Sequence, residues 1–218
     1  SSADVAKMPL KNLENPQVYS IVTNALLQEQ LNTNMTQALN NIPGAVATTD
    51  AAGGTSITMR GFTAEPAARN GVPVVYGRAS IDPVNIESIE ACKGASATLF
   101  GNFIASYGGA VNIVTKKPFD VFRGEIGYSF GSWGLNRVTA DINTPLNEDK
   151  TALLRVNAAV ARQQSFQQSG HNNVYAFDPS FMYKASDKLT LSVDMEIYGE
   201  NLMRVPFLNF SRLSVTNL

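Results

Sequence analysis

The stretch from Ile86 to Pro118, IESIEACKGASATLFGNFIASYGGAVNIVTKKP, determines how the rest of the chain is interpreted. A short apolar run stops at Lys93-Gly94, a segment of small residues follows, and a strand-like run leads from the glycine pair to Lys116-Lys117-Pro118. This pattern predicts a strand, a tight helical turn, a glycine turn and a second strand. The pair Gly108-Gly109 supplies positive φ or close backbone approach, and proline ends strand pairing because it has no N–H. Alone, the pattern predicts a compact α/β segment.

The residues before this stretch mix helix and strand signals. Asn34-Met35-Thr36-Gln37 matches a capping box, in which the asparagine side chain accepts a hydrogen bond from the glutamine N–H. Asp82-Pro83 combines an N-cap residue with proline at the first helical position, which predicts a short helix. Asn70-Gly71 is typical of a type I′ turn. We interpret residues 45–54 and 63–71 as loops, and the mixture predicts a small α+β domain.

From Phe122 onward the apolar residues alternate with polar ones. The apolar face comprises Phe122, Ile126, Tyr128, Phe130, Val138, Ile142, Leu154, Val156, Val160, Tyr175, Phe177, Phe181, Tyr183, Leu189, Leu191, Val193, Met195 and Ile197. Successive alternating segments of about ten residues, joined by polar turns, are typical of a transmembrane β-barrel. A soluble β-sandwich alternates as well. Charged residues on one face of every segment, and aromatic residues near the strand ends, favour the membrane barrel.

Composition narrows the possible functions. Charged residues make up 16% of the 218 residues, and no apolar run approaches the length of a spanning helix. The net charge of −1 without a basic run argues against nucleic acid as a partner. One cysteine, Cys92, and one histidine, His171, exclude an intrachain disulfide and most metal or nucleophile constellations. The glycine-rich segment lacks the Lys-Ser/Thr of a phosphate-binding loop, so an enzyme is disfavoured.

Three motifs carry a resemblance to a known family. The segments IESIEACKGASATLFG and GGAVNIVTKKP, preceded by Ile57-Thr58-Met59-Arg60-Gly61-Phe62, resemble the plug domain of TonB-dependent outer-membrane receptors, in the siderophore-receptor branch. Ala95 departs from the proline usual in the family. The resemblance implies an α+β plug over residues 1–118, inside the barrel lumen, and the first strands of an antiparallel transmembrane β-barrel over residues 119–218. Plugged transporters have about 22 strands, so we expect an N-terminal part of a larger receptor.

The resemblance also implies a ligand site. In hydroxamate-siderophore receptors, the arginine of the RGF motif, a polar loop and the aromatic residue of the LFG motif approach the ferric chelate. The matching positions are Arg60, Tyr76-Gly77-Arg78 and Phe100. Arginine donors and a tyrosine hydroxyl suit the oxygens of such a chelate, and an aromatic face suits its apolar rim. Phe100 lacks the hydroxyl that many relatives have at this position.

A second set of charged residues has a different implied role. Glu87, Glu90 and Lys93 are interpreted as plug–barrel ion-pairing residues, which the family also uses. For Arg60, plug–barrel ion pairing is the alternative to ligand binding. The segment that contacts TonB is expected upstream of Lys7.

The resulting expectation is an active importer in the outer membrane of a Gram-negative bacterium. Its implied partners are a ferric siderophore, TonB of the TonB–ExbB–ExbD complex and outer-membrane lipid. No cofactor is expected, and iron enters only within the bound siderophore. Cobalamin or a glycan is the alternative cargo, and a passive porin or adhesin barrel is the alternative of a different class.

Overall fold

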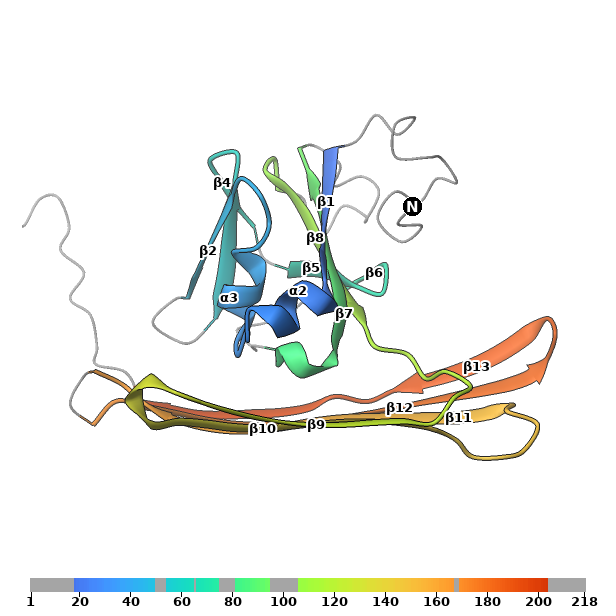
Figure 1. Ribbon diagram of the computed structural model, residues 1–218. Coiled ribbons are helices and arrows are strands. Elements are labelled where there is room, and N and C mark those ends of the chain that lie inside the picture. The colour runs from blue at the N-terminus through green and yellow to red at the C-terminus, as the bar shows by residue number, and fades with distance from the viewer. Residues whose placement is uncertain are drawn as a thin grey trace, which may run out of the picture.

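The chain folds into two parts, each built mainly of β-strands. The computed structural model describes residues 18–49, 54–64, 66–74, 81–94, 106–166 and 169–203. We call the described residues up to Thr115 the N-terminal unit, those from Arg123 the C-terminal sheet, and residues 116–122 the linking segment. Figure 1 shows the N-terminal unit resting on one face of the long strands of the C-terminal sheet.

Two sheets frame the N-terminal unit. The larger, in spatial order, consists of β1 (Val18–Thr23), β7 (Ile86–Lys93), β8 (Gly109–Thr115), β5 (Pro66–Arg69) and β6 (Val72–Pro73). The smaller consists of β2 (Ala45–Thr49), β3 (Thr55–Met59) and β4 (Phe62–Ala64). Among the described strands of this unit, the pairing of β5 with β8 is parallel and the others are antiparallel.

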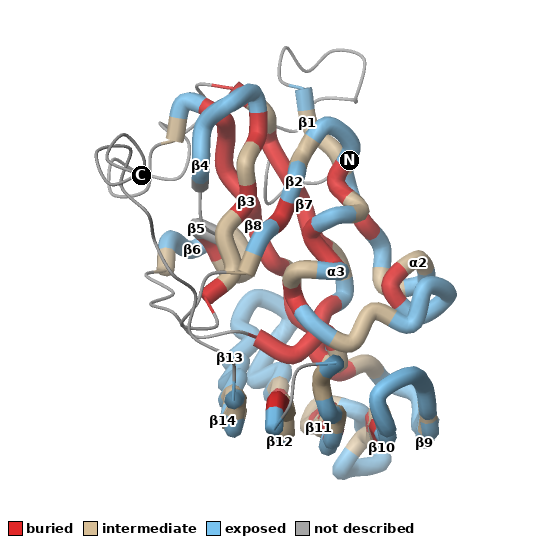
Figure 2. Tube along the Cα trace, turned by 90° about the vertical axis from the view of Figure 1, so that its left-hand side faces the viewer, coloured by how far each residue is buried: buried red, intermediate tan, exposed pale blue. Residues whose placement is uncertain are grey.

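Short helical segments pack against these sheets. They are α2 (Asn24–Glu29), α3 (Met35–Leu39) and the 3-10 turn η1 (Pro83–Asn85). One apolar core joins both sheets and both helices, and its largest fully buried members are Leu39, Ile42, Ile57, Met59, Ile86, Ile89 and Ile113. Burial of each such side chain contributes about 1.5–3 kcal/mol, so the core holds the helices on the sheets (Figure 2). No helix in the described ranges is long and apolar enough to cross a membrane.

The glycine pair before β8 makes the close approach that the sequence predicts. A Cβ atom on Gly108 would lie 2.5 Å from the backbone oxygen of Met59, and one on Gly109 would overlap the backbone oxygen of Cys92. Gly109 also has a positive φ of 138°. Side chains are therefore excluded where β3, β7 and β8 converge. The predicted helical turn between β7 and β8 lies outside the described residues.

The predicted caps and turn are present. The Gln37 N–H donates to Asn34 Oδ1 at 2.9 Å at the start of α3. Asn70 and Gly71 have φ of 48° and 78° in the β5–β6 hairpin, as a type I′ turn requires. Asp82 Oδ1 accepts from the Val84 N–H at 2.8 Å. A single 3-10 turn comes next instead of a helix, because β7 begins directly after it.

The loop interpretation of residues 45–54 and 63–71 is wrong in part. The first contains β2, which pairs along its whole length with β3. Only Ala47 of β2 is buried, so the strand shows no apolar alternation. The second contains β5, whose parallel pairing with β8 joins residues more than 40 apart along the chain. A local pattern indicates neither pairing.

The C-terminal sheet is a set of long neighbouring strands. They are β9 (Arg123–Gly131), β10 (Leu135–Pro145), β11 (Ala152–Gln164), β12 (His171–Ser186), β13 (Leu189–Asp194) and β14 (Ile197–Met203), with the 3-10 turn η4 (Ser132–Gly134) between β9 and β10. All described pairings in this sheet are antiparallel. β13 and β14 pair with successive parts of β12, and the Met195 N–H donates to the Pro179 oxygen between them.

The alternation separates two faces of this sheet. Ile126 and Phe130 on the apolar face are 78% and 81% exposed, whereas Arg137 and Asn157 on the polar face are 5% and 0% exposed. Figure 2 shows the N-terminal unit over one face of this sheet, and the contact between Arg137 and Asp82 identifies that face as the polar one. The face with charged side chains is therefore the covered one, and the apolar face points outward, as in a membrane barrel.

Candidate functional site

Buried or half-buried polar side chains occupy the boundary between the N-terminal unit and the C-terminal sheet. We call this set the polar interface, and it consists of Asp82, Asn85, Lys116, Arg137, Asp141, Arg155 and Asn157. Buried charges are costly unless they are paired and hydrogen-bonded. Each charged member of the polar interface has such a partner.

Arg137 of β10 and Asp82 form a two-pronged ion pair across the boundary. Arg137 Nη1 donates to Asp82 Oδ2 at 2.9 Å, and Nη2 donates to Oδ1 at 2.5 Å. Their side chains are 5% and 1% exposed. The planar guanidinium matches the carboxylate geometry in this arrangement. Asp82 is held in place because it also caps the turn η1.

Asp141 of β10 receives two cations, one from the linking segment and one from the neighbouring strand. Lys116 Nζ lies 2.8 Å from Asp141 Oδ2. Arg155 of β11 donates to the same carboxylate through Nε at 2.9 Å and Nη2 at 2.8 Å. Arg155 Nη1 also donates to the Lys117 backbone oxygen at 3.0 Å. The linking segment is thereby fixed to two neighbouring strands of the C-terminal sheet.

Neutral polar groups complete this attachment. Asn143 Nδ2 donates to the backbone oxygens of Phe119 and Val121, and the Phe119 N–H donates to Asn143 Oδ1. Asn157 is fully buried between Asn85 and Asp141, and with its amide nitrogen toward Asp141 it donates to both carboxylate oxygens. The Asn143 bonds satisfy backbone groups that the linking segment removes from water.

A further ion pair lies farther along the boundary. Arg69 at the end of β5 pairs with Glu196, which lies between β13 and β14. Glu196 faces Asp178 of β12, as the flanking pairs Ser180↔Asp194 and Phe177↔Ile197 show. Arg69 therefore places a positive charge beside the neighbouring carboxylates of Glu196 and Asp178.

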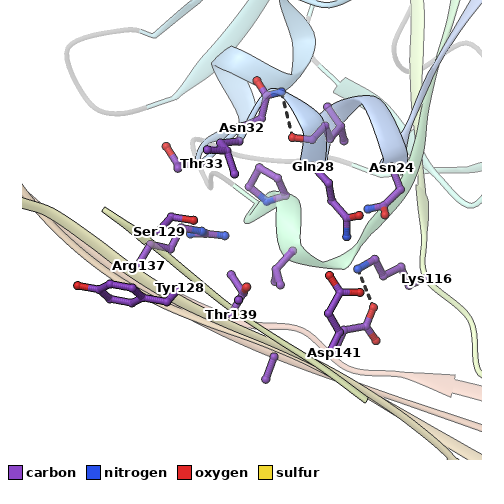
Figure 3. Close-up of a pocket in the computed structure, with 17 residues that line it drawn as sticks. Asn24, Gln28, Asn32, Thr33, Lys116, Tyr128, Ser129, Arg137, Thr139 and Asp141 are labelled. Atoms are coloured by element: carbon purple, nitrogen blue, oxygen red, sulfur yellow. Dashed lines mark hydrogen bonds and ion pairs between the residues drawn. The ribbon is translucent and has the colours of Figure 1, made fainter. Parts of the chain in front are cut away.

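A cavity of about 290 Å³, lined by both apolar and polar side chains, opens beside these contacts, between α2 and the strands β9 and β10. Figure 3 shows Asn24 and Gln28 on one side and Thr139 and Asp141 on the other, with the Lys116–Asp141 pair at its end. Its lining offers donors and acceptors for water. The N-terminal unit thus contacts the C-terminal sheet through ion pairs at some points. At another point a cavity that can hold water separates the two.

The structure describes one of the predicted ligand residues. Arg60 lies exposed in the turn between β3 and β4, with a positive φ of 52°. A Cβ atom on Gly94 would lie 2.9 Å from Arg60 Nη1, so the guanidinium lies against Gly94 at the end of β7. Tyr76, Gly77, Arg78 and Phe100 lie outside the described residues. Their predicted contacts stay a prediction.

The three residues predicted for plug–barrel pairing all lie on β7. Glu87 is exposed, and Lys93 is half-buried at the end of the strand. Glu90 is buried and accepts a hydrogen bond from Asn112 Nδ2 of β8 at 2.9 Å. The ion pairs of the polar interface use other residues, and pairing of Glu87, Glu90 and Lys93 with a barrel stays a prediction.

Sequence and structure comparisons agree on the family. The sequence profile of the TonB-dependent receptor plug domain matches residues 11–109. The ferripyoverdine receptor of the outer membrane of Pseudomonas aeruginosa superposes with a TM-score of 0.83 at 23% identity, over 91% of this chain and 27% of that structure. Residues 11–109 belong to the plug-domain family of the TonB-dependent receptors. The N-terminal unit is the receptor's plug, and the C-terminal sheet matches barrel strands of the solved receptors.

The relatives named for a cargo match different lengths of the receptor chain. A metal-pseudopaline receptor of Pseudomonas aeruginosa (strain UCBPP-PA14) is 35% identical over 53% of this chain and 16% of its own. The ferrichrome outer membrane transporter/phage receptor of Escherichia coli K12 is 30% identical over 79% of this chain and 24% of its own. The alcaligin outer-membrane receptor of Bordetella pertussis superposes with a TM-score of 0.77 at 26% identity, over 91% and 34%.

The matched region is a minor share of each of these relatives. The receptor chain spans about a quarter or less of the length of the two sequence relatives. Its family and fold place it in the outer membrane of a Gram-negative bacterium.

The sequence patterns do not reveal the ion pairs that join plug and barrel. They indicate Asp82 only as a helix cap and Lys116 only as a strand end. The period-two pattern does place Arg137, Asp141 and Arg155 on the inward face. A usable signal is the number of charged residues on that face, because buried charges require partners on whatever covers them.

Proposed function

We propose that this chain is the N-terminal part of a TonB-dependent transporter that binds a ferric siderophore and imports it into the periplasm. Relatives named as ferrichrome, ferripyoverdine and ferrioxamine B receptors support this cargo class. Those relatives are receptors and transporters by name. Ligand contacts at Arg60, Tyr76, Gly77, Arg78 and Phe100 are part of the proposal.

One structural observation carries the proposal of active transport. The plug covers the polar face of the barrel sheet and is held there by ion pairs such as Arg137–Asp82 and Lys116–Asp141. Parting a buried ion pair costs several kcal/mol. Passage of a large solute therefore requires energy to rearrange the plug, and we propose that TonB of the TonB–ExbB–ExbD complex supplies it from the proton gradient.

The same observation disfavours a passive porin or adhesin barrel. A passive channel needs an open lumen, whereas a plug bonded to the wall blocks it. The exposed apolar face of the barrel sheet is proposed to contact outer-membrane lipid.

The test measures uptake by cells that carry the full-length receptor. Cells receive siderophores loaded with radioactive iron, with or without a protonophore that collapses the proton gradient. We expect one ferric chelate to accumulate only in energised cells, while surface binding persists after collapse. Arg60→Ala should weaken binding, and Arg123→Ala, which changes an exposed arginine on β9, should not.

Two outcomes would contradict the proposal in different ways. Accumulation that is insensitive to the protonophore indicates a passive barrel. Binding of cobalamin or an oligosaccharide, without binding of any iron chelate, retains the transporter class and overturns the siderophore cargo.

A further inference from the structure

Two aromatic rings meet on the surface of the plug next to Arg60. Phe62 begins β4, and Tyr107 lies in the turn before β8. Their ring centroids are 5.6 Å apart with an interplanar angle of 51°. Phe62 is 50% exposed and Tyr107 is 76% exposed. We call Arg60, Phe62 and Tyr107 the aryl subsite.

Contacts between the turn before β8 and the β3–β4 hairpin hold together the two segments that carry the rings. Ser106 Oγ donates to the Thr63 oxygen at 3.2 Å and accepts from the Gly108 N–H at 3.1 Å. A Cβ on Gly108 would lie 3.0 Å from the Phe62 oxygen, so the turn before β8 lies directly on the β3–β4 hairpin. The two segments that carry the rings are therefore held together without a ligand, which lowers the ordering cost for a ligand that contacts both rings.

Arg60 brings a positive charge to the same end of the plug. Its guanidinium lies against Gly94, and the Gly94 N–H donates to the Gly108 oxygen at 2.9 Å. Arg60 thus contacts Gly94, which is hydrogen-bonded to Gly108, the residue that follows Tyr107. Figure 1 shows β4 and the start of β8 at the end of the plug farthest from the barrel sheet, so this end is also remote from the polar interface.

Two exposed aromatic rings beside an arginine favour one chemical class of ligand. Exposed rings bind flat unsaturated groups through stacked or edge-to-face contacts. A guanidinium pairs with anionic oxygens. An aryl ring that carries its chelating oxygens, as in a catecholate or phenolate, presents both features within one group, whereas an aliphatic hydroxamate presents only the oxygens.

We propose that the aryl subsite binds an aromatic iron-chelating group of the cargo, with Phe62 and Tyr107 against its ring and Arg60 at its oxygens. This inference rests on the proposed siderophore function and narrows its cargo to aryl chelates. Tyr107 acts in it as a specificity-determining residue.

The test compares two probes on the full-length receptor in outer-membrane vesicles without an energy source. The probes are radioactive iron complexed by a synthetic tris-catechol chelator and by the aliphatic tris-hydroxamate desferrioxamine B. Tyr107→Leu should weaken binding of the catechol complex by about three- to tenfold and leave the hydroxamate complex within about twofold. Tyr107→Phe keeps the ring and should retain catechol binding.

Controls separate this inference from the proposed function. Tyr183→Leu removes an exposed tyrosine on the outer face of β12 and should change neither affinity. Equal effects of Tyr107→Leu on both complexes, or no effect on the catechol complex, would overturn the aryl subsite. Wild-type receptor that binds only the hydroxamate complex overturns it too, while siderophore import stands. Wild-type receptor that binds neither ferric complex but binds cobalamin overturns the siderophore proposal itself.

Discussion

Removing the cation from the Arg137–Asp82 pair should strongly destabilise the plug inside the barrel. Arg137→Gln leaves the Asp82 carboxylate, whose side chain is 1% exposed, without its positive partner. An uncompensated buried charge costs about 3–5 kcal/mol. Glutamine still offers its amide NH2 group as a donor and water can reach a lumen, so we expect the free energy of plug opening to fall by about 2–4 kcal/mol.

Chemical labelling of Cys92 measures this change in the free energy of plug opening. Cys92 is the one cysteine among the 218 residues and is fully buried in β7. A maleimide labels its thiol only when the plug opens, so the ratio of labelling rates gives the change in opening free energy. Because each 1.36 kcal/mol is a factor of ten, Arg137→Gln should accelerate labelling by about 30- to 900-fold. Mass spectrometry of the full-length receptor locates the label on the peptide that contains Cys92.

Two comparisons make the experiment decisive. Arg123→Gln removes an arginine from an exposed pair with Glu125, and such pairs contribute less than about 1 kcal/mol. Asp82→Asn with Arg137→Gln removes both charges and keeps a residue that caps helical turns, so it should label more slowly than Arg137→Gln alone. Equal rates for Arg137→Gln and Arg123→Gln, or a double variant whose effect equals the product of the single effects, would refute the reasoning.

Three further substitutions test other parts of the fold. Gly108→Ala places a Cβ 2.5 Å from the Met59 oxygen and should lower the yield of folded receptor on semi-native gels, whereas Gly124→Ala, with its nearest atom at 3.8 Å, should not. Asn34→Ala removes the cap of α3 and should lower the stability of the plug by about 1 kcal/mol, which corresponds to about fivefold faster labelling of Cys92. An unchanged labelling rate in Asn34→Ala, or an equal increase in Asn34→Asp, which can still cap the helix, would argue against this role of Asn34. Val138→Lys on the outer face should reduce the free energy of folding into lipid bilayers by about 2–4 kcal/mol, and comparable loss in Thr139→Lys on the opposite face would contradict the assignment of faces.

Local patterns predict the elements that local forces determine. The side-chain caps at Asn34 and Asp82 and the turn at Asn70-Gly71 depend on neighbouring residues, and they form as the sequence predicts. The two faces of the barrel sheet follow from the two-residue period of a strand. Strand β2 escapes prediction because its stability comes from pairing with β3 and not from an apolar face of its own.

The candidate sites are less predictable for the same reason. The sequence places Arg137 and Asp141 on an inward face, but their partners Asp82 and Lys116 depend on how the plug and the linking segment meet the wall. Glu90 is equally suited to a barrel contact by its sequence, yet it bonds to Asn112 within the plug sheet. Tyr107 has no distinguishing pattern, because its ring acquires a role only where the turn before β8 lies on the β3–β4 hairpin.

The linking segment has a consequence for the order of assembly. Lys116 and Asp141 are 25 residues apart, and Phe119 and Asn143 are 24 apart, so closing these contacts costs less loop-closure entropy than closing contacts between residues far apart in the chain. Arg69 and Glu196 are far more distant in sequence and meet across strands that form later along the chain. We expect the first barrel hairpin to capture the end of the plug before the rest of the wall exists. The wall then closes around a domain that is already tethered at one end, which makes insertion of a finished plug into a finished barrel unnecessary.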